Sequence, residues 1–166
     1  PVEMDTPFGA PSGPILMGQI DGQRIAFLSR HGPGHLYRPS SVPYRANIYA
    51  MKKLGVTHII ASGATGSLQE AIKPRDLVIC DQVIDKTWAR ANTFFEDFVA
   101  HIEFADPFCR SLRHVLIEAA EGIEADVHPE GTYVCMEGPQ FSTRAESHMH
   151  RQWGADLIGM TCMPEA

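Results

Sequence analysis

Strand-length apolar runs alternate with amphipathic helical segments through this sequence, and that alternation constrains the fold more than any other feature. The spacing predicts strands over residues 57–61, 76–80, 132–136 and 155–160. It predicts helices over residues 43–54, 107–121 and 142–153. Continuously apolar strands that alternate with helices indicate an α/β fold, with a central mixed, partly parallel sheet flanked by helices.

A hairpin is expected before the first of these helices. Two apolar runs, residues 15–20 and 24–29, are joined by Asp21-Gly22, which is typical of a two-residue hairpin turn. Residues 85–106 contain several aromatic side chains without a clean period. We expect this stretch to be a long functional or interfacial excursion.

The predicted helices have recognisable ends and faces. Ser41 is expected to cap the helix over residues 43–54, and Gly55 to close it. The helix over residues 107–121 is expected to face inward through Leu112, Val115, Leu116 and Ala119. The two imidazoles of residues 148–150 point to different faces of the third helix, so both are interpreted as surface groups.

Composition and charge exclude several classes of protein. The 166 residues are 44% hydrophobic, which is enough for one folded domain spanning residues 1–166. The formal charge is −6 and there is no run of Lys or Arg, which argues against nucleic acid or a membrane as partner. No apolar stretch approaches the roughly 18 residues that cross a bilayer, and the first residues lack a signal peptide. We therefore expect a cytoplasmic protein.

The cysteines lie far apart in the sequence and form no CxxC pair: Cys80, Cys109, Cys135 and Cys162. This spacing excludes a zinc ribbon and is too sparse for a disulfide scaffold. We interpret the four as mostly buried free thiols, with structural disulfides as the alternative. No metal-ligand spacing is found elsewhere, so no metal is expected.

Two segments are candidates for binding an anion. Residues 63–66, Gly-Ala-Thr-Gly, follow the strand predicted over 57–61, and their small side chains let backbone N–H groups converge on a phosphate. A tight strand-to-strand connection is the alternative. Arg30 and His31 end the run over 24–29, where Arg offers a planar fork and His a further donor. For these two, a surface Arg beside a turn His is the alternative.

Two later segments are candidates for contacting a nucleoside. Phe141 follows Gly-Pro at a junction between strand and helix, where an exposed flat ring can stack on a base. Met160 ends the last predicted strand and offers a soft surface to a sugar, and the Thr161 hydroxyl can donate to a phosphate. Ordinary packing is the alternative for each of them.

Five motifs occur in a fixed order along the chain: Arg30-His31-Gly32 with His35, Gly63-Ala64-Thr65-Gly66-Ser67-Leu68, Asp81-Gln82-Val83-Ile84-Asp85, Glu137-Gly138-Pro139-Gln140-Phe141-Ser142, and Gly154-Ala155-Asp156-Leu157-Ile158-Gly159-Met160-Thr161 with Met163-Pro164-Glu165. Together they resemble the trimeric purine nucleoside phosphorylase family, closest to its methylthioadenosine phosphorylases. The resemblance covers essentially all 166 residues and implies the nucleoside phosphorylase fold. Family members are longer, so we expect this chain to lack the family's N- and C-terminal segments.

The resemblance also implies a role for each motif. It implies that phosphate is held by Arg30, His31, Gly63, Ala64 and Thr161, of which Arg30, His31 and Thr161 are the implied catalytic residues. It implies that the nucleoside contacts Phe141, Ser142, Ile158, Gly159, Met160 and His35. It further implies a homotrimer, in which His101 reaches into the neighbouring subunit's site near the 5′ end of the sugar.

The implied reaction is phosphorolysis of 5′-methylthioadenosine to adenine and 5-methylthioribose 1-phosphate, a pentosyl transfer in purine salvage. Phosphate is a co-substrate that attacks C1′ and stabilises an oxocarbenium-like state, so no metal or organic cofactor is expected. Two alternatives stay open. One is a purine nucleoside phosphorylase that prefers 6-oxopurines or methylthioinosine. The other is a non-catalytic homologue or fragment that binds nucleosides or fills an oligomer.

Ser142 bears on the choice of base. Family members that act on 6-oxopurines carry a carboxylate at this place, where it accepts the N1–H of the base. Adenine N1 has no proton, and a hydroxyl can turn to donate to it, so Ser142 favours 6-aminopurines. The alternative is that Ser142 caps the following helix toward Glu146.

Overall fold

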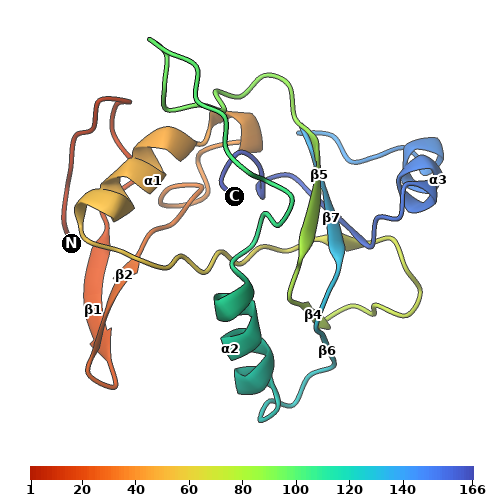
Figure 1. The fold of residues 1–166 in the computed structure, drawn as a ribbon. Coiled ribbons are helices and arrows are strands. Elements are labelled where there is room, and N and C mark those ends of the chain that lie inside the picture. Colours follow the sequence, from red (N-terminus) through yellow and green to blue (C-terminus); the bar gives the residue numbers. More distant parts are fainter. The chain divides into compact units, whose positions relative to one another are not determined.

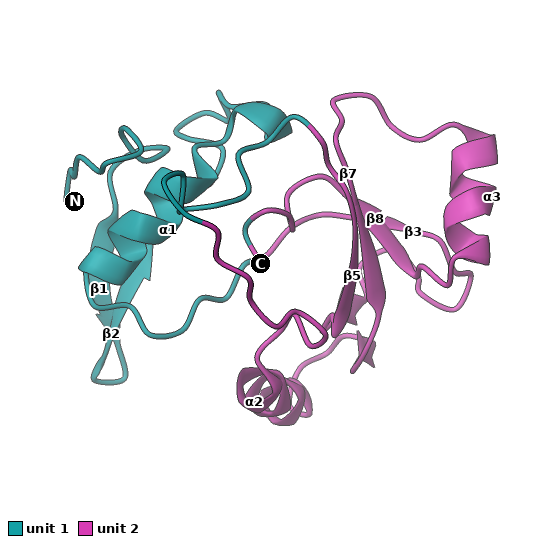
Figure 2. Cartoon of the chain, turned by 45° about the horizontal axis from the view of Figure 1, so that its top comes forward, with its two compact units in different colours: residues 1–61, 89–98, 165 teal, residues 62–88, 99–164, 166 magenta.

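A computed structural model describes all 166 residues and divides them into two compact units. The first unit comprises residues 1–61, 89–98 and 165, and the second comprises residues 62–88, 99–164 and 166 (Figure 2). No helix of either unit is both long enough and apolar enough to cross a membrane.

The first unit contains the predicted hairpin. Strands β1 (Leu16–Ile20) and β2 (Gln23–Phe27) are antiparallel and pair Leu16 with Phe27. Asp21 and Gly22 between them have φ values of 48° and 80°, as the two central residues of a type I′ turn require. The hairpin prediction is confirmed.

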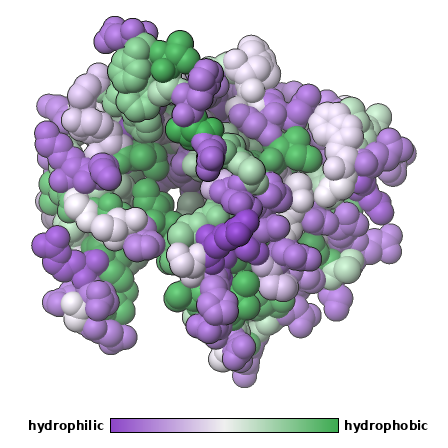
Figure 3. Space-filling view, viewed as in Figure 1, coloured by the Kyte–Doolittle hydropathy of each residue, from purple (hydrophilic) through white to green (hydrophobic).

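The hairpin keeps an uncovered apolar face. Leu16, Ile20 and Phe27 lie on the same side of the two strands and are 53%, 52% and 51% exposed. Hydrophobic surface is accordingly visible along the hairpin in the space-filling view (Figure 3). Ile15, which precedes β1, is fully buried, whereas no residue of the two hairpin strands is buried.

Helix α1 (Tyr44–Lys53) confirms the helix predicted over residues 43–54 and follows a short 3-10 turn, η1 (Pro39–Ser41). It buries Tyr44, Ala46, Asn47 and Ala50. Gly55 follows it with φ of 82°, as expected for a closing glycine. The cap predicted from Ser41 is wrong. Pro43 takes the N-cap position, and the Ser41 hydroxyl instead accepts a hydrogen bond from Arg38 Nε at 2.9 Å.

The second unit is built on a four-stranded mixed sheet with the order β3-β8-β7-β5. The strands are β3 (Gly66–Ser67), β8 (Leu157–Gly159), β7 (Thr132–Met136) and β5 (Gln82–Lys86). The pairs β5–β7 and β7–β8 are parallel, and β3 is antiparallel to β8 (Figure 2). The prediction of a mixed, partly parallel sheet is confirmed.

Strand β7 lies at the centre of the sheet and contributes to both hydrophobic clusters of the unit. Val134 packs with Leu68 and Ala155, whereas Tyr133 and Cys135 pack with Leu157. Neighbouring residues of a strand point to opposite faces, so the two clusters lie on opposite faces of the sheet. Val134 and Cys135 have no exposed surface.

The sheet is flanked by helices, as predicted. Helix α3 (Arg144–Gln152) lies on one side, and α2 (Arg110–Ala120) lies near the end where β5 and β7 begin (Figures 1 and 2). Arg113 of α2 donates to the carbonyl oxygens of Cys80 and Pro129. The inward face predicted for α2 forms only in part. Leu112 and Leu116 are half-buried, whereas Val115 is 56% exposed and Ala119 is exposed.

The strand predicted over residues 57–61 is wrong. This segment is extended but belongs to no sheet, and its Ile59 and Ile60 are 44% and 65% exposed. A β-branched sequence supplies strand propensity, but a strand forms only where a neighbour accepts and donates its backbone hydrogen bonds. No segment of the chain is placed to do so.

Strands β3 and β5 and the two-residue β6 (Val127–His128) were not predicted. The strand expected over residues 76–80 shortens to β4 (Leu77–Val78), because its only partner is the two-residue β6 (Val127–His128), to which it is parallel. Strand β5 occupies the start of the expected excursion over 85–106. The rest of that stretch contains no helix or strand, as expected.

The four cysteines are all free. Cys135 is buried, Cys80 and Cys162 are half-buried, and Cys109 is exposed, so the expectation of mostly buried thiols fails for Cys109. Cys109 is exposed because it sits at the N-cap of α2, a helix that has no buried residue. Burial raises the pKa of the Cys80 thiol to about 11, which keeps that group protonated at neutral pH.

Candidate functional site

The end of β8 is the most tightly fitted part of the predicted site. A Cβ on Gly159 would overlap the phenol oxygen of Tyr133 and would lie 3.2 Å from Cγ2 of Thr65. Only glycine leaves room for both neighbours. The backbone at Gly159 is therefore approached closely by β7 on one side and by the small-residue segment on the other.

The small-residue segment also lies beside Thr161. A Cβ on Gly63 would be 4.0 Å from Thr161 Oγ1. The structure thus brings together Gly63 and Thr161, two residues for which the resemblance implies contact with phosphate. The alternative of a tight strand-to-strand connection is not observed, because the preceding strand does not form and residues 62–65 run extended into β3.

Tyr133 supports this end of β8 and was missed by the sequence analysis. Its ring is buried, and its oxygen lies beside Gly159 at the end of β8. Burial raises the pKa of Tyr133 well above its usual range, so the hydroxyl stays neutral. The available signal was a tyrosine inside a continuously apolar strand, because a buried phenol needs a hydrogen-bond partner.

Met160 packs against the turn that follows β7. A Cβ on Gly138, which has φ of 71°, would lie 2.6 Å from Met160 Sδ. The turn therefore rests directly on the Met160 side chain. Ile158 and Met160 are half-buried, and Phe141, three residues beyond Gly138, is 86% exposed. The predicted exposed position of the Phe141 ring is confirmed.

Ser142 does not cap the helix. Thr143 is the N-cap of α3, and its Oγ1 accepts from Glu146 N at 3.2 Å while its own N donates to Glu146 Oε2 at 2.7 Å. These hydrogen bonds lower the pKa of Glu146. Because the capping box is complete without it, Ser142 directs its hydroxyl elsewhere and donates to Met136 Sδ at 3.6 Å. The capping alternative is therefore wrong by one residue.

Arg30, His31 and His35 belong to the first unit, where they lie just beyond the end of β2. Arg30 forms an ion pair with Glu165, and both side chains are mostly buried. The rings of His31 and His35 stack with centroids 4.1 Å apart. The structure therefore brings His31 and His35 together.

The hydrogen bond of His31 fixes which nitrogen carries its proton. His31 Nδ1 lies 2.7 Å from the carbonyl oxygen of Tyr37, which can only accept, so Nδ1 donates. In a neutral ring Nε2 is then an acceptor, and it donates only when the ring is protonated. Contact between Nε2 and a phosphate oxygen therefore requires a proton on either His31 or the phosphate.

His101 lies in the exposed coil of the second unit, which contains no helix or strand between residues 99 and 109. Its neighbours along the chain are also exposed, including Ile102 at 77% and Val99 at 80%. The apolar surface here has no cover within the chain.

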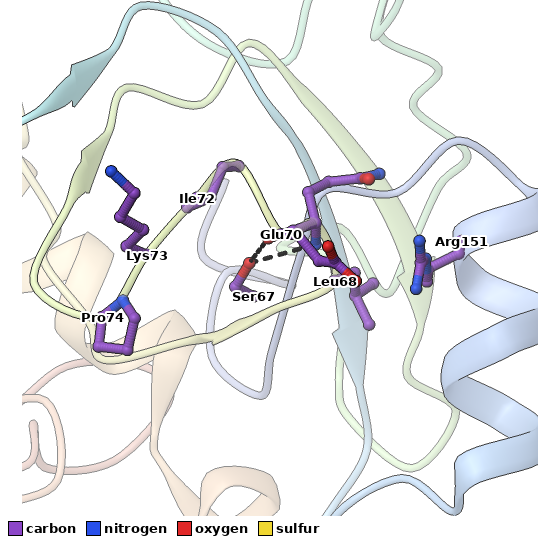
Figure 4. Close-up of a pocket in the computed structure, with 8 residues that line it drawn as sticks. Ser67, Leu68, Glu70, Ile72, Lys73, Pro74 and Arg151 are labelled. Carbon is purple, nitrogen blue, oxygen red and sulfur yellow. Dashed lines mark hydrogen bonds between the residues drawn. The ribbon is translucent and has the colours of Figure 1, made fainter.

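Two cavities lie away from the predicted site residues. One, of about 360 Å³, is lined by Ser67, Leu68, Gln69, Glu70, Ile72, Lys73, Pro74 and Arg151. Lys73 and Arg151 lie at opposite ends of this lining (Figure 4). The other, of about 200 Å³, lies beside α1 in the first unit. No group of three or more His, Cys, Asp or Glu side chains is placed to hold a metal ion.

The two imidazoles of residues 148–150 differ. His148 is exposed, as predicted, but His150 is only 4% exposed, so its assignment to the surface is wrong. The ring packs edge-on against Trp153, and its Nδ1 has no hydrogen-bond partner. Desolvation lowers the pKa of His150. His150 is the only buried residue of α3.

Comparison with known proteins decides the family. A family model described as the phosphorylase superfamily matches residues 2–166. The chain belongs to the phosphorylase superfamily. The family resemblance found in the sequence is confirmed, and with it the fold class.

Named relatives of this superfamily chain share its sequence across nearly its whole length. It is 57% identical to S-methyl-5′-thioadenosine phosphorylase of Geobacter sulfurreducens and 54% identical to that of Pyrococcus furiosus, over 99% of this chain in each case. It spans 58% and 64% of the length of these two curated relatives. A solved structure of Schistosoma mansoni methylthioadenosine phosphorylase with tubercidin is 43% identical, with a TM-score of 0.95, covering 98% of this chain and 65% of that one.

Proposed function

We propose that the protein catalyses phosphorolysis of 5′-methylthioadenosine to adenine and 5-methylthioribose 1-phosphate. One observation carries the proposal: relatives at 51–57% identity over 99% of this chain are named S-methyl-5′-thioadenosine phosphorylase. The packing of residues 63–65 against Gly159 and Thr161 supports it, because backbone N–H groups and a hydroxyl there can converge on an anion.

Inorganic phosphate is the proposed co-substrate, and no other cofactor is invoked. The proposed phosphate ligands are Arg30, His31, Gly63, Ala64 and Thr161. Arg30 supplies fixed charge and a planar set of donors, and Thr161 supplies a hydroxyl. A phosphate dianion held in this way is both the nucleophile at C1′ and the counter-charge for the oxocarbenium-like state.

The nucleoside is proposed to lie against the segment after β7 and the end of β8. The exposed ring of Phe141 stacks on the purine, and Met160 contacts the ribose. Further proposed contacts come from His35, Ser142, Ile158 and Gly159. Since Thr143 caps α3, the Ser142 hydroxyl is not required by the helix and can turn from Met136 toward adenine N1.

We also propose that the protein is a homotrimer. Large apolar side chains between residues 88 and 104 are exposed, among them Trp88 at 83%, Phe98 at 62% and Ile102 at 77%. Exposed apolar surface of this kind marks an interaction site. His101 lies in the same stretch and is proposed to reach a neighbouring subunit's nucleoside.

Release of adenine from 5′-methylthioadenosine, followed by chromatography with and without phosphate, tests the proposed reaction. We expect release only with phosphate, and a sugar 1-phosphate as the second product. Thr161→Ala should raise KM for phosphate more than KM for the nucleoside, whereas Thr161→Ser keeps the hydroxyl and should stay near wild type. Release without phosphate, or no release at all, contradicts the proposal.

Adenosine is a second candidate substrate. Solved structures that are 42–43% identical are described as adenosine/methylthioadenosine phosphorylase of Schistosoma mansoni. The same assay with adenosine in place of 5′-methylthioadenosine, at matched concentrations, ranks the two by kcat/KM.

A further inference from the structure

Arg30 is bound by the carboxylate of Glu165, for which the family resemblance implied no role. Arg30 Nε donates to Glu165 Oε1 at 2.6 Å, and Nη2 donates to Oε2 at 2.6 Å. Two parallel bonds between a guanidinium and a carboxylate fix the orientation of both groups. The two side chains are only 16% and 14% exposed, so water screens the pair little.

The main chain of Arg30 is anchored separately. Ser12 Oγ donates to the Arg30 carbonyl oxygen at 2.6 Å. Asn47 of α1 holds Ser12 in turn, since its Nδ2 donates to Ser12 Oγ at 2.9 Å and its Oδ1 accepts from Ser12 N at 2.8 Å. Ser12 and Asn47 are buried, at 3% and 4% exposed. Arg30 is thus held at its backbone and at its guanidinium.

We propose that Glu165 is a positioning residue that orients the Arg30 guanidinium for inorganic phosphate. The inference rests on the proposed function, in which Arg30 is a phosphate ligand. A long Arg side chain loses rotamer freedom when it binds a ligand, and the ion pair removes that loss in advance. Glu165 engages the Nε–Nη2 edge of the guanidinium and so fixes the orientation of its plane.

The opposite role for Glu165 makes the opposite prediction. A carboxylate beside Arg30 also lowers the local positive charge, so a Glu165 that merely competed with phosphate would weaken anion binding. Removing a competitor tightens phosphate binding, whereas removing a positioning group weakens it. The sign of the change separates the two roles.

Titration calorimetry of the intact protein with inorganic phosphate measures that sign without requiring turnover. Glu165→Gln keeps the size of the side chain and removes its charge and one of the two acceptor oxygens. We expect it to raise the Kd for phosphate about tenfold or more, the usual effect of losing a hydrogen bond to a charged group. Glu165→Asp keeps the carboxylate and should lose less. Glu118→Gln is the matched control, since Glu118 pairs with His114 on the exposed face of α2.

Kinetics and a double mutant separate positioning from simple stabilisation. Glu165→Gln should raise KM for phosphate and leave KM for the nucleoside within about twofold. In an Arg30→Ala background the same substitution should change phosphate binding no further, because residues that act through one another are not additive. A full effect in that background overturns the proposal. Unchanged or tighter phosphate binding in Glu165→Gln also overturns it, even if the variant unfolds more easily.

The two proposals fail in different ways. Phosphate binding that depends on Glu165, without phosphorolysis of any nucleoside, overturns the proposed function and leaves the role of Glu165 standing. Phosphorolysis whose phosphate dependence is the same in Glu165→Gln overturns only the role of Glu165. A wild-type protein that binds no phosphate overturns both.

Discussion

The phenol oxygen of Tyr133 fills the space in which residue 159 would carry a Cβ, so that an alanine methyl would overlap it. The ring carbon bearing the hydroxyl is also close, at 2.6 Å from the same point. Tyr133 cannot withdraw without leaving the hydrophobic cluster that it forms with Cys135 and Leu157. Gly159 of β8 therefore lies in close contact both with a core side chain of β7 and with the proposed phosphate-binding segment.

Gly159→Ala should lower the free energy of unfolding by roughly 1–3 kcal/mol, because an added methyl in a packed site forces its neighbours apart. Urea unfolding followed by circular dichroism measures the change. Gly122→Ala is the control, since a Cβ there meets nothing within 4 Å, and it should change stability by less than about 0.5 kcal/mol. Equal effects from the two substitutions would show that the close approach is not rigid.

Two substitutions at His31 should separate its two nitrogens. Asn places an amide N–H near Nδ1 and can keep the bond to the Tyr37 carbonyl, whereas Gln reaches the position of Nε2. If Nε2 contacts phosphate, His31→Asn should raise KM for phosphate about tenfold or more, and His31→Gln should raise it less. Thermal unfolding should rank them in reverse, with Asn closer to wild type. The same order in both assays argues against a phosphate role for Nε2.

Ser142→Glu should shift preference toward 6-oxopurines. A carboxylate accepts the N1–H of methylthioinosine but faces a lone pair on adenine N1, so the ratio of kcat/KM for the two substrates should move by tenfold or more. Thr143→Ala is the neighbouring control, because it removes the cap of α3 at a cost of about 1 kcal/mol without touching the base. A ratio that responds equally to both substitutions removes the residue-level support for adenine.

His150 should make the protein less stable in mild acid. Its pKa is lowered in the folded state by burial, with Lys86 adding to the shift and Glu146 opposing it. As the pH falls, the unfolded chain takes up the proton first, so this contribution to stability is complete above the ordinary histidine pKa of about 6.5 and is lost below it. Unfolding midpoints measured between about pH 7 and pH 5 should fall less in His150→Phe than in wild type. The exposed His148→Phe should retain the wild-type slope.

Sequence periodicity located elements whose partners lie within the chain. The bounds of β7 and the hairpin turn agree with prediction, because an apolar run and a turn dipeptide carry their own signal. Residues 57–61 have an equally good strand sequence and form none, since pairing depends on a neighbour rather than on propensity. The sequence of a segment indicates its strand propensity, but it does not indicate whether another strand lies beside it.

The candidate site, like the fold, was predictable only in part from the sequence. The motifs indicated its residues, and the structure places Gly63, Gly159 and Thr161 together. It does so through Tyr133, whose side chain reads as core in the sequence, and it pairs Arg30 with Glu165 across 135 residues of chain. Contacts between residues so far apart depend on the tertiary fold, which local patterns do not encode.

The parallel register of β5 and β7 has a consequence for the order in which the chain folds. Gln82 pairs with Thr132, so about fifty residues must be drawn into a closed loop before the first bond of that ladder forms. The β1–β2 hairpin closes over two residues and belongs to the microsecond regime of local structure. The central sheet is built from non-local pairs and sets the slow step, so a newly made chain presents its hairpin long before β8 brings Gly159 and Thr161 to residues 63–65.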